Sequence, residues 1–300
     1  MLSSFKNALI REKYKLLKIS YCFLIVSLAK KYITKNNLFV KIHYMYPNLF
    51  GMEGSSMGIM MALGVIFAII EVTIFLKRKN LARENIIDFL IVCLVTIFMG
   101  IVFSMLFENL YESIKHAVNN EPQAWTWSKT FYGGLFGGVT TFLLMYKFFY
   151  LKNNQPIIKE VLKIAPSAIC LGHGIGRIGC FLNGCCYGIE TDSWIGVTFP
   201  GHNHKVIPTQ LIEMIFLLLL ALVLAILAFK NITVHTMPIY LLTYGVFRFV
   251  IEFYRGDERG QLSGLSPSQY WCILLVVSAV ALYFIYNKVI FKKEETPNEV

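Results

Sequence analysis

Seven long apolar segments dominate the sequence, and they constrain the fold more than any other feature. Most of them approach the ~20 residues that a helix needs to cross the hydrocarbon core of a bilayer. They lie at residues 56–76, 87–107, 131–150, 161–182, 209–229, 238–254 and 267–291. None shows the alternation of apolar and polar residues that is typical of barrel strands. We therefore predict an all-α, polytopic membrane protein with about seven transmembrane helices around a lipid-accessible cavity.

Composition supports the same class. The 300 residues are 56% hydrophobic and only 15% charged, and the mean hydropathy of +0.58 is too high for a water-soluble domain of this size. The net charge of +10 would also suit a nucleic-acid partner. However, the lysines and arginines lie in loops and tails beside apolar runs, where anionic lipid and membrane topology explain them. We therefore expect a membrane environment and no nucleic acid.

The basic residues also predict an orientation. Clusters of lysine and arginine follow the first, third, fifth and last apolar segments. Because cytoplasmic loops are enriched in these residues, we expect these four ends to face the cytoplasm. The core then begins outside and ends inside. The basic N-terminus fits this orientation if it is translocated or if an eighth span precedes the core.

The chain divides into three regions. Residues 1–42 form a basic arm whose apolar run, 19–29, is short for a span, so we predict an interfacial helix there. A signal peptide is the alternative, but no small-residue cleavage pattern follows. Residues 43–293 form one seven-helix membrane domain, and residues 294–300 form a polar tail.

The sixth apolar segment carries a polar stripe. Tyr244, Arg248, Glu252 and Arg255 are spaced so that they share one face of a helix. A charged side chain at mid-bilayer costs about 2.5 to 3.5 kcal/mol, and an ion pair between Arg248 and Glu252 would offset only part of this. A structural ion pair between helices is the simpler explanation. We favour a functional site, because another apolar segment of the sequence also contains an arginine.

That second arginine, Arg177, lies in the glycine-rich fourth segment. Gly172 and Gly176 form a small-xxx-small pair that allows close approach, and the later glycines allow the chain to leave helical geometry and line a cavity. A guanidinium offers a fork of donors that suits a phosphate. For His173 we favour a packing role over a chemical one.

Two other apolar segments, the third and the fifth, also contain residues that require an interpretation. The third begins with Gly133, Gly134, Gly137 and Gly138, which we take as too many for helix packing alone and as a flexible or closely approached entrance. In the fifth segment, we interpret Glu213 as a solvated or snorkelling end group.

The sequence gives little support for a metal site. Among the seven cysteines only Cys180, Cys185 and Cys186 cluster, and they lack the second pair or neighbouring histidine of a structural zinc site. His202 and His204 lack a third ligand. We expect no metal and no disulfide framework.

The fourth segment resembles the hallmark of the bacterial prolipoprotein diacylglyceryl transferases. The matching positions are Gly176, Arg177, Gly179, Phe181, Leu182, Asn183 and Gly188. Further similar positions are the Ile-Ala-Pro at 164–166, the Pro-Thr-Gln-Leu at 208–211, Tyr244 through Arg248 to Glu252 and Arg255, and Gln269. The resemblance covers roughly residues 45 to 290.

This resemblance implies an activity in the bacterial cytoplasmic membrane. The diacylglyceryl group of phosphatidylglycerol would be transferred to the lipobox cysteine at a preprolipoprotein signal peptide, releasing glycerol phosphate, with no metal or organic cofactor. By this resemblance Arg177 and Arg248 bind the phosphate, and Glu252 holds Arg248 or assists proton movement. Contacts to substrate are expected from Gly176, Asn183, Gly188, Gln210, Tyr244 and Arg255.

The chain also departs from the family pattern. Cys180 and Cys185 replace an asparagine and a glutamate of the hallmark, and Tyr132 replaces a histidine linked to proton transfer. A phenol, with a reference pKa of about 10, is a poor base at neutral pH. These changes indicate a divergent branch in which the proton-transfer role is either moved or lost, with Tyr132 as the candidate catalytic residue at that position. A related membrane lipid transferase with another acceptor, and a non-catalytic lipid-binding or transport protein, are the alternatives.

Overall fold

The computed structural model describes residues 55–119, 125, 130–147, 157–200, 203–256 and 264–290. Its helices are α2 (Ser55–Arg78), α3 (Arg83–Asn119), α4 (Phe131–Tyr146), α5 (Ile157–Leu182), α6 (Thr209–Phe229), α7 (Thr236–Glu252) and α8 (Pro267–Ile285), and a short π-helix (Tyr286–Ile290) extends α8. Each of the seven predicted segments therefore contains a helix. The basic arm, His202 and the polar tail lie outside the described residues.

Four of these helices are long and apolar enough to cross a membrane. They are α2, α3, α6 and α8, and α4 contains a shorter apolar helix, Gly133–Tyr146. Their large apolar side chains point outward, with Phe98 64% and Leu219 59% exposed. In water such surfaces would be costly, whereas in lipid they meet hydrocarbon. The chain is an all-α polytopic membrane protein. The helices α5 and α7 are not among those four. Polar residues interrupt the apolar run of α5, and α7 has only 17 residues and carries Arg248 and Glu252.

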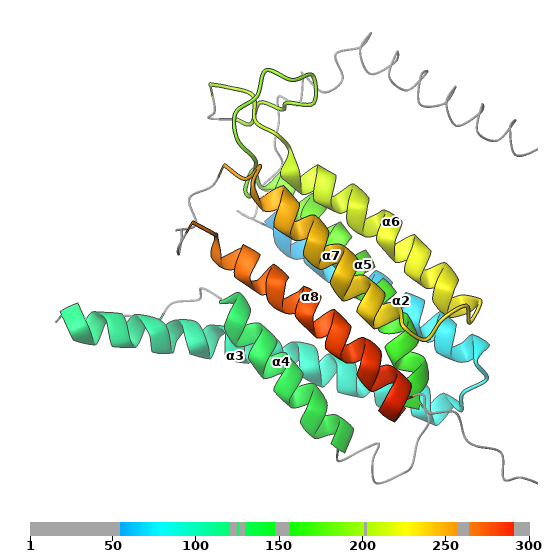
Figure 1. Cartoon of the computed structure of the whole chain (residues 1–300). Helices are drawn as coiled ribbons and strands as arrows, with labels where there is room; N and C mark the ends of the chain where they lie inside the picture. The colour runs from blue at the N-terminus through cyan, green and yellow to red at the C-terminus, as the bar shows by residue number, and fades with distance from the viewer. Residues whose placement is uncertain are drawn as a thin grey trace, which may run out of the picture.

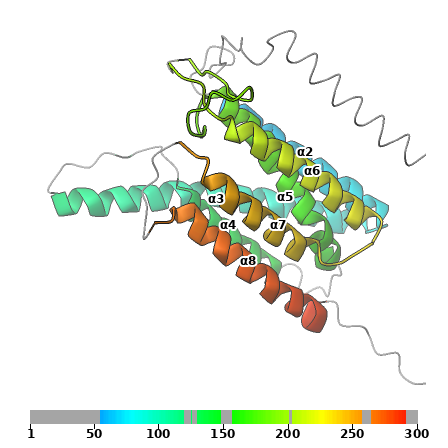
Figure 2. The ribbon, with the colours of Figure 1, turned by 45° about the horizontal axis from the view of Figure 1, so that its top comes forward.

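Helix α5 lies at the centre of the bundle. It packs against α2 on one side and α6 on the other, and it also contacts α7, while α3 pairs with α4 and α7 with α8 (Figure 1). One buried apolar cluster joins α2, α3 and α5 through residues such as Phe75 and Ile164. A second joins α5, α6 and α7 around Leu217. The C-terminal end of α3 extends beyond the other helices (Figure 2).

Glycines set the closest helix contacts. A Cβ at Gly64 of α2 would lie 2.6 Å from the Gly172 carbonyl oxygen of α5, so the predicted small-residue contact forms at Gly172. Gly176, one turn further, has nothing within 4 Å of such a Cβ. The glycines of this segment remain helical, and the chain leaves helical geometry only after Leu182.

The glycines of α4 are explained by packing against α3, contrary to our interpretation. A Cβ at Gly133 would lie 2.6 Å from the Phe107 Cβ, and one at Gly134 would lie 3.4 Å from the Gly100 oxygen. Phe103 similarly occupies the space beside Gly137. The close approach was predicted, but its partner is a neighbouring helix and not an entrance.

A pair of glycines in α2 offers a direct test of this packing. Gly64→Ala should lower the thermal unfolding midpoint in detergent, because overpacking against the Gly172 backbone costs about 1 to 3 kcal/mol. The matched control is Gly58→Ala, where an added Cβ meets nothing within 4 Å. That control should be neutral or slightly stabilising. Equal behaviour of the two variants would contradict the close contact.

The segment between α5 and α6 folds over one end of the bundle. It has a small apolar cluster of its own, Val197, Phe199 and Val206, and isolated antiparallel bridges join Glu190 and Val197 to Val206. A third bridge joins Gly188 to Arg255, just after α7. This lobe therefore ties the end of α5 to the end of α7, next to the polar residues described below (Figure 1).

Candidate active site

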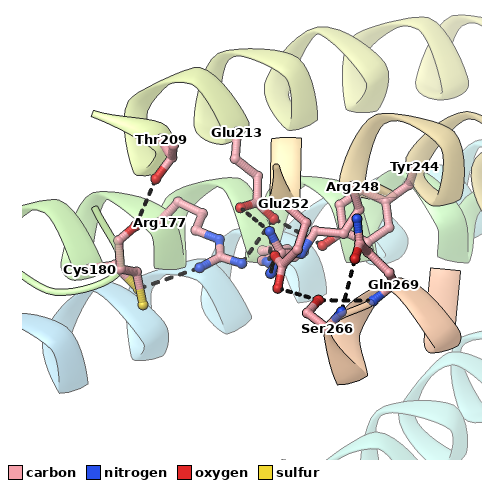
Figure 3. A network of polar contacts seen from close by, with 11 residues as sticks. Arg177, Cys180, Thr209, Glu213, Tyr244, Arg248, Glu252, Ser266 and Gln269 are labelled. Atoms are coloured by element: carbon pink, nitrogen blue, oxygen red, sulfur yellow. Dashed lines mark hydrogen bonds and ion pairs between the residues drawn. The ribbon is translucent and has the colours of Figure 1, made fainter. Parts of the chain in front are cut away.

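A single carboxylate, Glu213 of α6, lies at the centre of a buried polar network (Figure 3). Its Oε1 accepts hydrogen bonds of 2.9 Å from the Arg177 Nη2 and from the Tyr244 hydroxyl. Its Oε2 lies 3.9 Å from the Arg248 Nη1. Glu213 is 0% exposed, so our interpretation of a solvated end group was wrong. The first turns of α6 pack against α5 and α7, and this carboxylate faces both.

The polar stripe predicted for the sixth segment is confirmed for Tyr244, Arg248 and Glu252, whereas Arg255 lies beyond the end of α7. Arg248 Nη2 lies 2.7 Å from the Glu252 Oε2, one helical turn away, and both residues are buried. Helix α8 contributes a further partner, because the Ser266 hydroxyl donates to the Glu252 Oε1 at 2.9 Å. Ser266 is also the N-cap of α8 and forms a capping box with Gln269. The network thus joins α5, α6, α7 and α8.

His173 lies at the edge of this network. Its Nε2 is 3.7 Å from the Glu213 Oε1, and its ring meets the Tyr244 ring edge-on with centroids 5.5 Å apart. The side chain is 31% exposed, in contrast to the carboxylate that it faces. The contact with Tyr244 agrees with the packing role that we favoured.

Several buried polar atoms of the network, N–H donors among them, have no hydrogen-bond partner among the described residues even though its charges balance. Two guanidiniums, of Arg177 and Arg248, face two carboxylates, of Glu213 and Glu252. The Arg177 Nε and the Arg248 Nη1 are buried and make no hydrogen bond within the described part of the chain. A buried N–H without an acceptor costs free energy, which an oxyanion would recover. The arrangement is suited to a ligand with several acceptor oxygens.

Other predicted substrate contacts are engaged in the protein's own structure. The Gln210 Nε2 donates to the Cys185 carbonyl at 2.5 Å, and Thr209 donates to the Cys186 carbonyl at 2.8 Å. A Cβ at Gly188 would lie 2.5 Å from the Tyr254 oxygen, so glycine allows two chain segments to meet there. These residues therefore hold the backbone at the end of the site, and they lie outside the arginine pair.

Asn183 and Gly176 lie on either side of Arg177 along the chain. Asn183 is partly buried and follows the last residue of α5, where its N–H donates to the Gly179 carbonyl. Gly176 has open space beside its Cα. The structure describes the backbone of Tyr132 as the second residue of α4, but its side chain lies outside the described residues.

The turn after α5 brings three thiols together. The Sγ atoms of Cys180, Cys185 and Cys186 lie within 4.8 Å of one another. Cys186 and Gly184 adopt positive φ angles of 66° and 67°, which bend the chain back. Hydrogen bonds from the Cys180 and Cys185 thiols, together with Arg255, hold the pKa of the Cys186 thiol below its ordinary value.

Neither the buried central position of Glu213 nor the close approach of the three thiols was predicted from the sequence. The signal for Glu213 was available, because it is the only charged residue in the otherwise apolar helix Thr209–Phe229. The insertion cost that drew attention to Arg248 applies equally to it. The cysteine cluster depends on two positive φ angles, which the residue spacing does not reveal.

Comparisons with known proteins agree with this geometry. The family model described as prolipoprotein diacylglyceryl transferase matches residues 48–285. The chain belongs to this family. Phosphatidylglycerol–prolipoprotein diacylglyceryl transferases from Clostridium tetani and Finegoldia magna are similar to it. The first is 33% identical over 82% of this chain and 97% of the relative, and the second is 30% identical over 83% and 97%.

The match to the transferase family confirms the resemblance stated from the hallmark residues. A second enzyme of that description from Clostridium perfringens is 32% identical, over 82% of this chain and 96% of its own length. The similarity therefore extends from α2 to α8. It includes every helix that contributes to the arginine network.

Proposed function

We propose that this chain transfers the diacylglyceryl group of phosphatidylglycerol to the cysteine thiol of a prolipoprotein. Family membership and the names of its relatives support this reaction. The structural observation that carries it is the pair of neighbouring guanidiniums of Arg177 and Arg248, each of which has a buried nitrogen without a hydrogen-bond partner among the described residues. A non-catalytic lipid-binding or transport protein would use the same anion site, but it gives no reason for the similarity to transferases along nearly the whole chain.

The reaction makes one bond and breaks one. The thiol sulfur attacks the glyceryl carbon that bears the phosphate, and a carbon–sulfur bond forms. The bond between that carbon and the phosphate ester oxygen breaks. The oxygen leaves with the electron pair as part of glycerol phosphate, and the thiol loses its proton. Negative charge therefore increases on the phosphate oxygens in the transition state. Preorganised donors directed at that charge lower the barrier.

Each residue of the network has a distinct proposed role. Arg177 and Arg248 donate to the phosphate through the Nε and Nη1 atoms that lack other acceptors. Glu213 fixes Arg177, and Glu252 fixes Arg248, so that the guanidinium forks do not reorient during the reaction. Because the Tyr244 hydroxyl donates to Glu213, it orients that carboxylate, and a headgroup contact by Tyr244 would use its ring.

The remaining substrate contacts follow from position. Gly176 leaves open space one residue before Arg177. Asn183, which follows the last residue of α5, is proposed to contact the polar headgroup. Gln210, Gly188 and Arg255 hold the lobe that covers this end. The proposed location is the bacterial cytoplasmic membrane, with several spans whose lysine- and arginine-rich ends face the cytoplasm.

Reconstitution tests the proposed reaction directly. The purified chain is placed in vesicles that contain phosphatidylglycerol, with a peptide bearing a lipobox cysteine as acceptor. We expect a thioether-linked diacylglyceryl peptide together with released glycerol phosphate, both measured by mass spectrometry. Vesicles containing phosphatidylethanolamine alone are the control. Phosphatidylglycerol binding without transfer would favour the lipid-binding alternative, and transfer from another lipid would favour a related transferase.

Tyr132 is proposed to take the catalytic place of the family histidine. Tyr132→His should raise the rate of peptide lipidation at neutral pH, because imidazole has a reference pKa of about 6.5 and is the better base. Tyr132→Phe should be slower than the wild type, because it removes the hydroxyl. Both rates are measured in the same vesicle assay. A phenylalanine variant with the wild-type rate would exclude a chemical role for this side chain.

A further inference from the structure

The three-thiol cluster at the end of α5 is not used by the proposed reaction. Cys180 is buried in the last turn of α5, and Cys185 and Cys186 are partly buried in the turn that follows. All three are free thiols. Sequence spacing argued against a metal, because no second pair or neighbouring histidine is present. The fold nevertheless brings three soft ligands to one point.

The distances suit one metal ion. A tetrahedral zinc ion with Zn–S bonds of ~2.3 Å holds its sulfur ligands about 3.8 Å apart. The three Sγ atoms lie within 4.8 Å of one another. This limit exceeds the spacing in a zinc site by only about 1 Å, so the thiols would move little on binding. A trigonal cuprous ion requires a similar separation of its thiolate ligands.

The backbone that carries the ligands is held from outside the cluster. The Thr209 and Gln210 side chains donate to the carbonyl oxygens of Cys186 and Cys185, at 2.8 Å and 2.5 Å. The Cys185 N–H donates to the Cys180 carbonyl at 3.2 Å. These contacts orient the two adjacent cysteines toward the third, so little conformational entropy would be lost on binding a metal.

Two cationic side chains lie beside the three thiols. The Arg177 Nη1 lies 4.0 Å from the Cys180 Sγ, and Arg255 interacts with the Cys186 side chain. Three thiolates and one divalent ion leave a net charge of −1, which these arginines neutralise.

We propose that Cys180, Cys185 and Cys186 form a three-thiolate site for a thiophilic d10 metal ion, Zn²⁺ or Cu⁺. Structural zinc sites have four protein ligands, whereas sites with three retain an exchangeable position. The described residues supply three. Bound zinc would therefore keep a fourth position, open to water or to an external thiol, beside Arg177.

Cobalt replaces zinc as the spectroscopic probe. The full-length protein is purified in detergent, reduced, freed of metal by a chelator and titrated anaerobically with Co²⁺. We expect one Co²⁺ per chain, an intense thiolate-to-cobalt charge-transfer band, and loss of that band when Zn²⁺ is added. Cys185→Ser and Cys186→Ser should each weaken binding by at least about 100-fold, since even outer-shell changes cost 10- to 100-fold. Cys93→Ser, a partly buried cysteine of α3 outside the cluster, is the matched control and should bind like the wild type.

A second measurement uses the wild-type protein alone, so it does not depend on folding of the variants. Zn²⁺ should protect Cys185 and Cys186 from alkylation by N-ethylmaleimide, while Cys93 reacts at an unchanged rate. Competition of Cu⁺ against a chromophoric cuprous chelator then determines which ion binds more tightly. The proposal is overturned if the wild type gives no charge-transfer band, if zinc protects none of the three, or if anaerobically purified protein contains a disulfide between them.

Discussion

Replacing Arg177 by alanine is expected to lower the rate of peptide lipidation by at least about 10²- to 10³-fold, the loss that follows removal of one preorganised donor to a developing anion. Arg177 occupies the middle of the network, and its Nη2 donates to Glu213 while its Nε remains available to a ligand. The substitution removes both. The rate of thioether formation in phosphatidylglycerol vesicles measures the effect.

Two further variants separate charge from geometry at this position. Arg177→Lys keeps the positive charge but loses the planar fork, so it should recover only a small part of the lost rate. Arg83→Ala is the matched control, because Arg83 is exposed at the first residue of α3, away from the network. It should lipidate at the wild-type rate. Undiminished turnover by Arg177→Ala would rule out the phosphate role assigned to this side chain.

The second large effect is expected at Glu213. Glu213→Gln should reduce stability by about 3 to 5 kcal/mol, because removing one partner of a buried ion pair leaves an uncompensated charge. In this case two guanidiniums, of Arg177 and Arg248, lose the carboxylate that they share. Lipidation should also fall sharply, since Arg177 then loses the carboxylate that holds it in place. Thermal unfolding in detergent and the vesicle assay measure the two effects.

Glu160→Gln is the matched control for this substitution. Glu160 pairs with Lys79 and Lys163 near the opposite end of α5, and its side chain is 22% exposed. Ion pairs that reach solvent contribute about 0 to 1 kcal/mol, so this variant should remain close to the wild type in both measurements. If Glu213→Gln were as stable and as active as Glu160→Gln, the central position of Glu213 would have no energetic consequence.

Much of this architecture follows from local sequence pattern. A segment of about 20 apolar residues has few alternatives to a membrane helix, because backbone polar groups in lipid must be satisfied within the segment. The spacing of Tyr244, Arg248 and Glu252 likewise predicts one helical face, and their shared network confirms it. In both cases the information lies within a single element.

The parts that were missed depend on contacts between elements. Whether Glu213 faces lipid headgroups or two arginines is decided by the packing of α5 and α7 against α6. Whether Gly133 permits flexibility or close packing is decided by Phe107 of another helix. A helix period identifies which residues share a face, but it does not identify the opposing surface. Residues whose arrangement is set by a single helix were thus easier to predict than residues whose role depends on a neighbouring helix.

The hydroxyl of Ser266 links two processes that are usually separate. It caps the first turn of α8 and, at the same time, donates to the carboxylate that holds Arg248. An anion that competes for Arg248 alters the electron density on Glu252, and hence the bond that Glu252 accepts from Ser266. The winding of α8 is therefore thermodynamically linked to what the arginines bind. Trp271, in the second turn of that helix, is a native fluorophore close to the cap formed by Ser266.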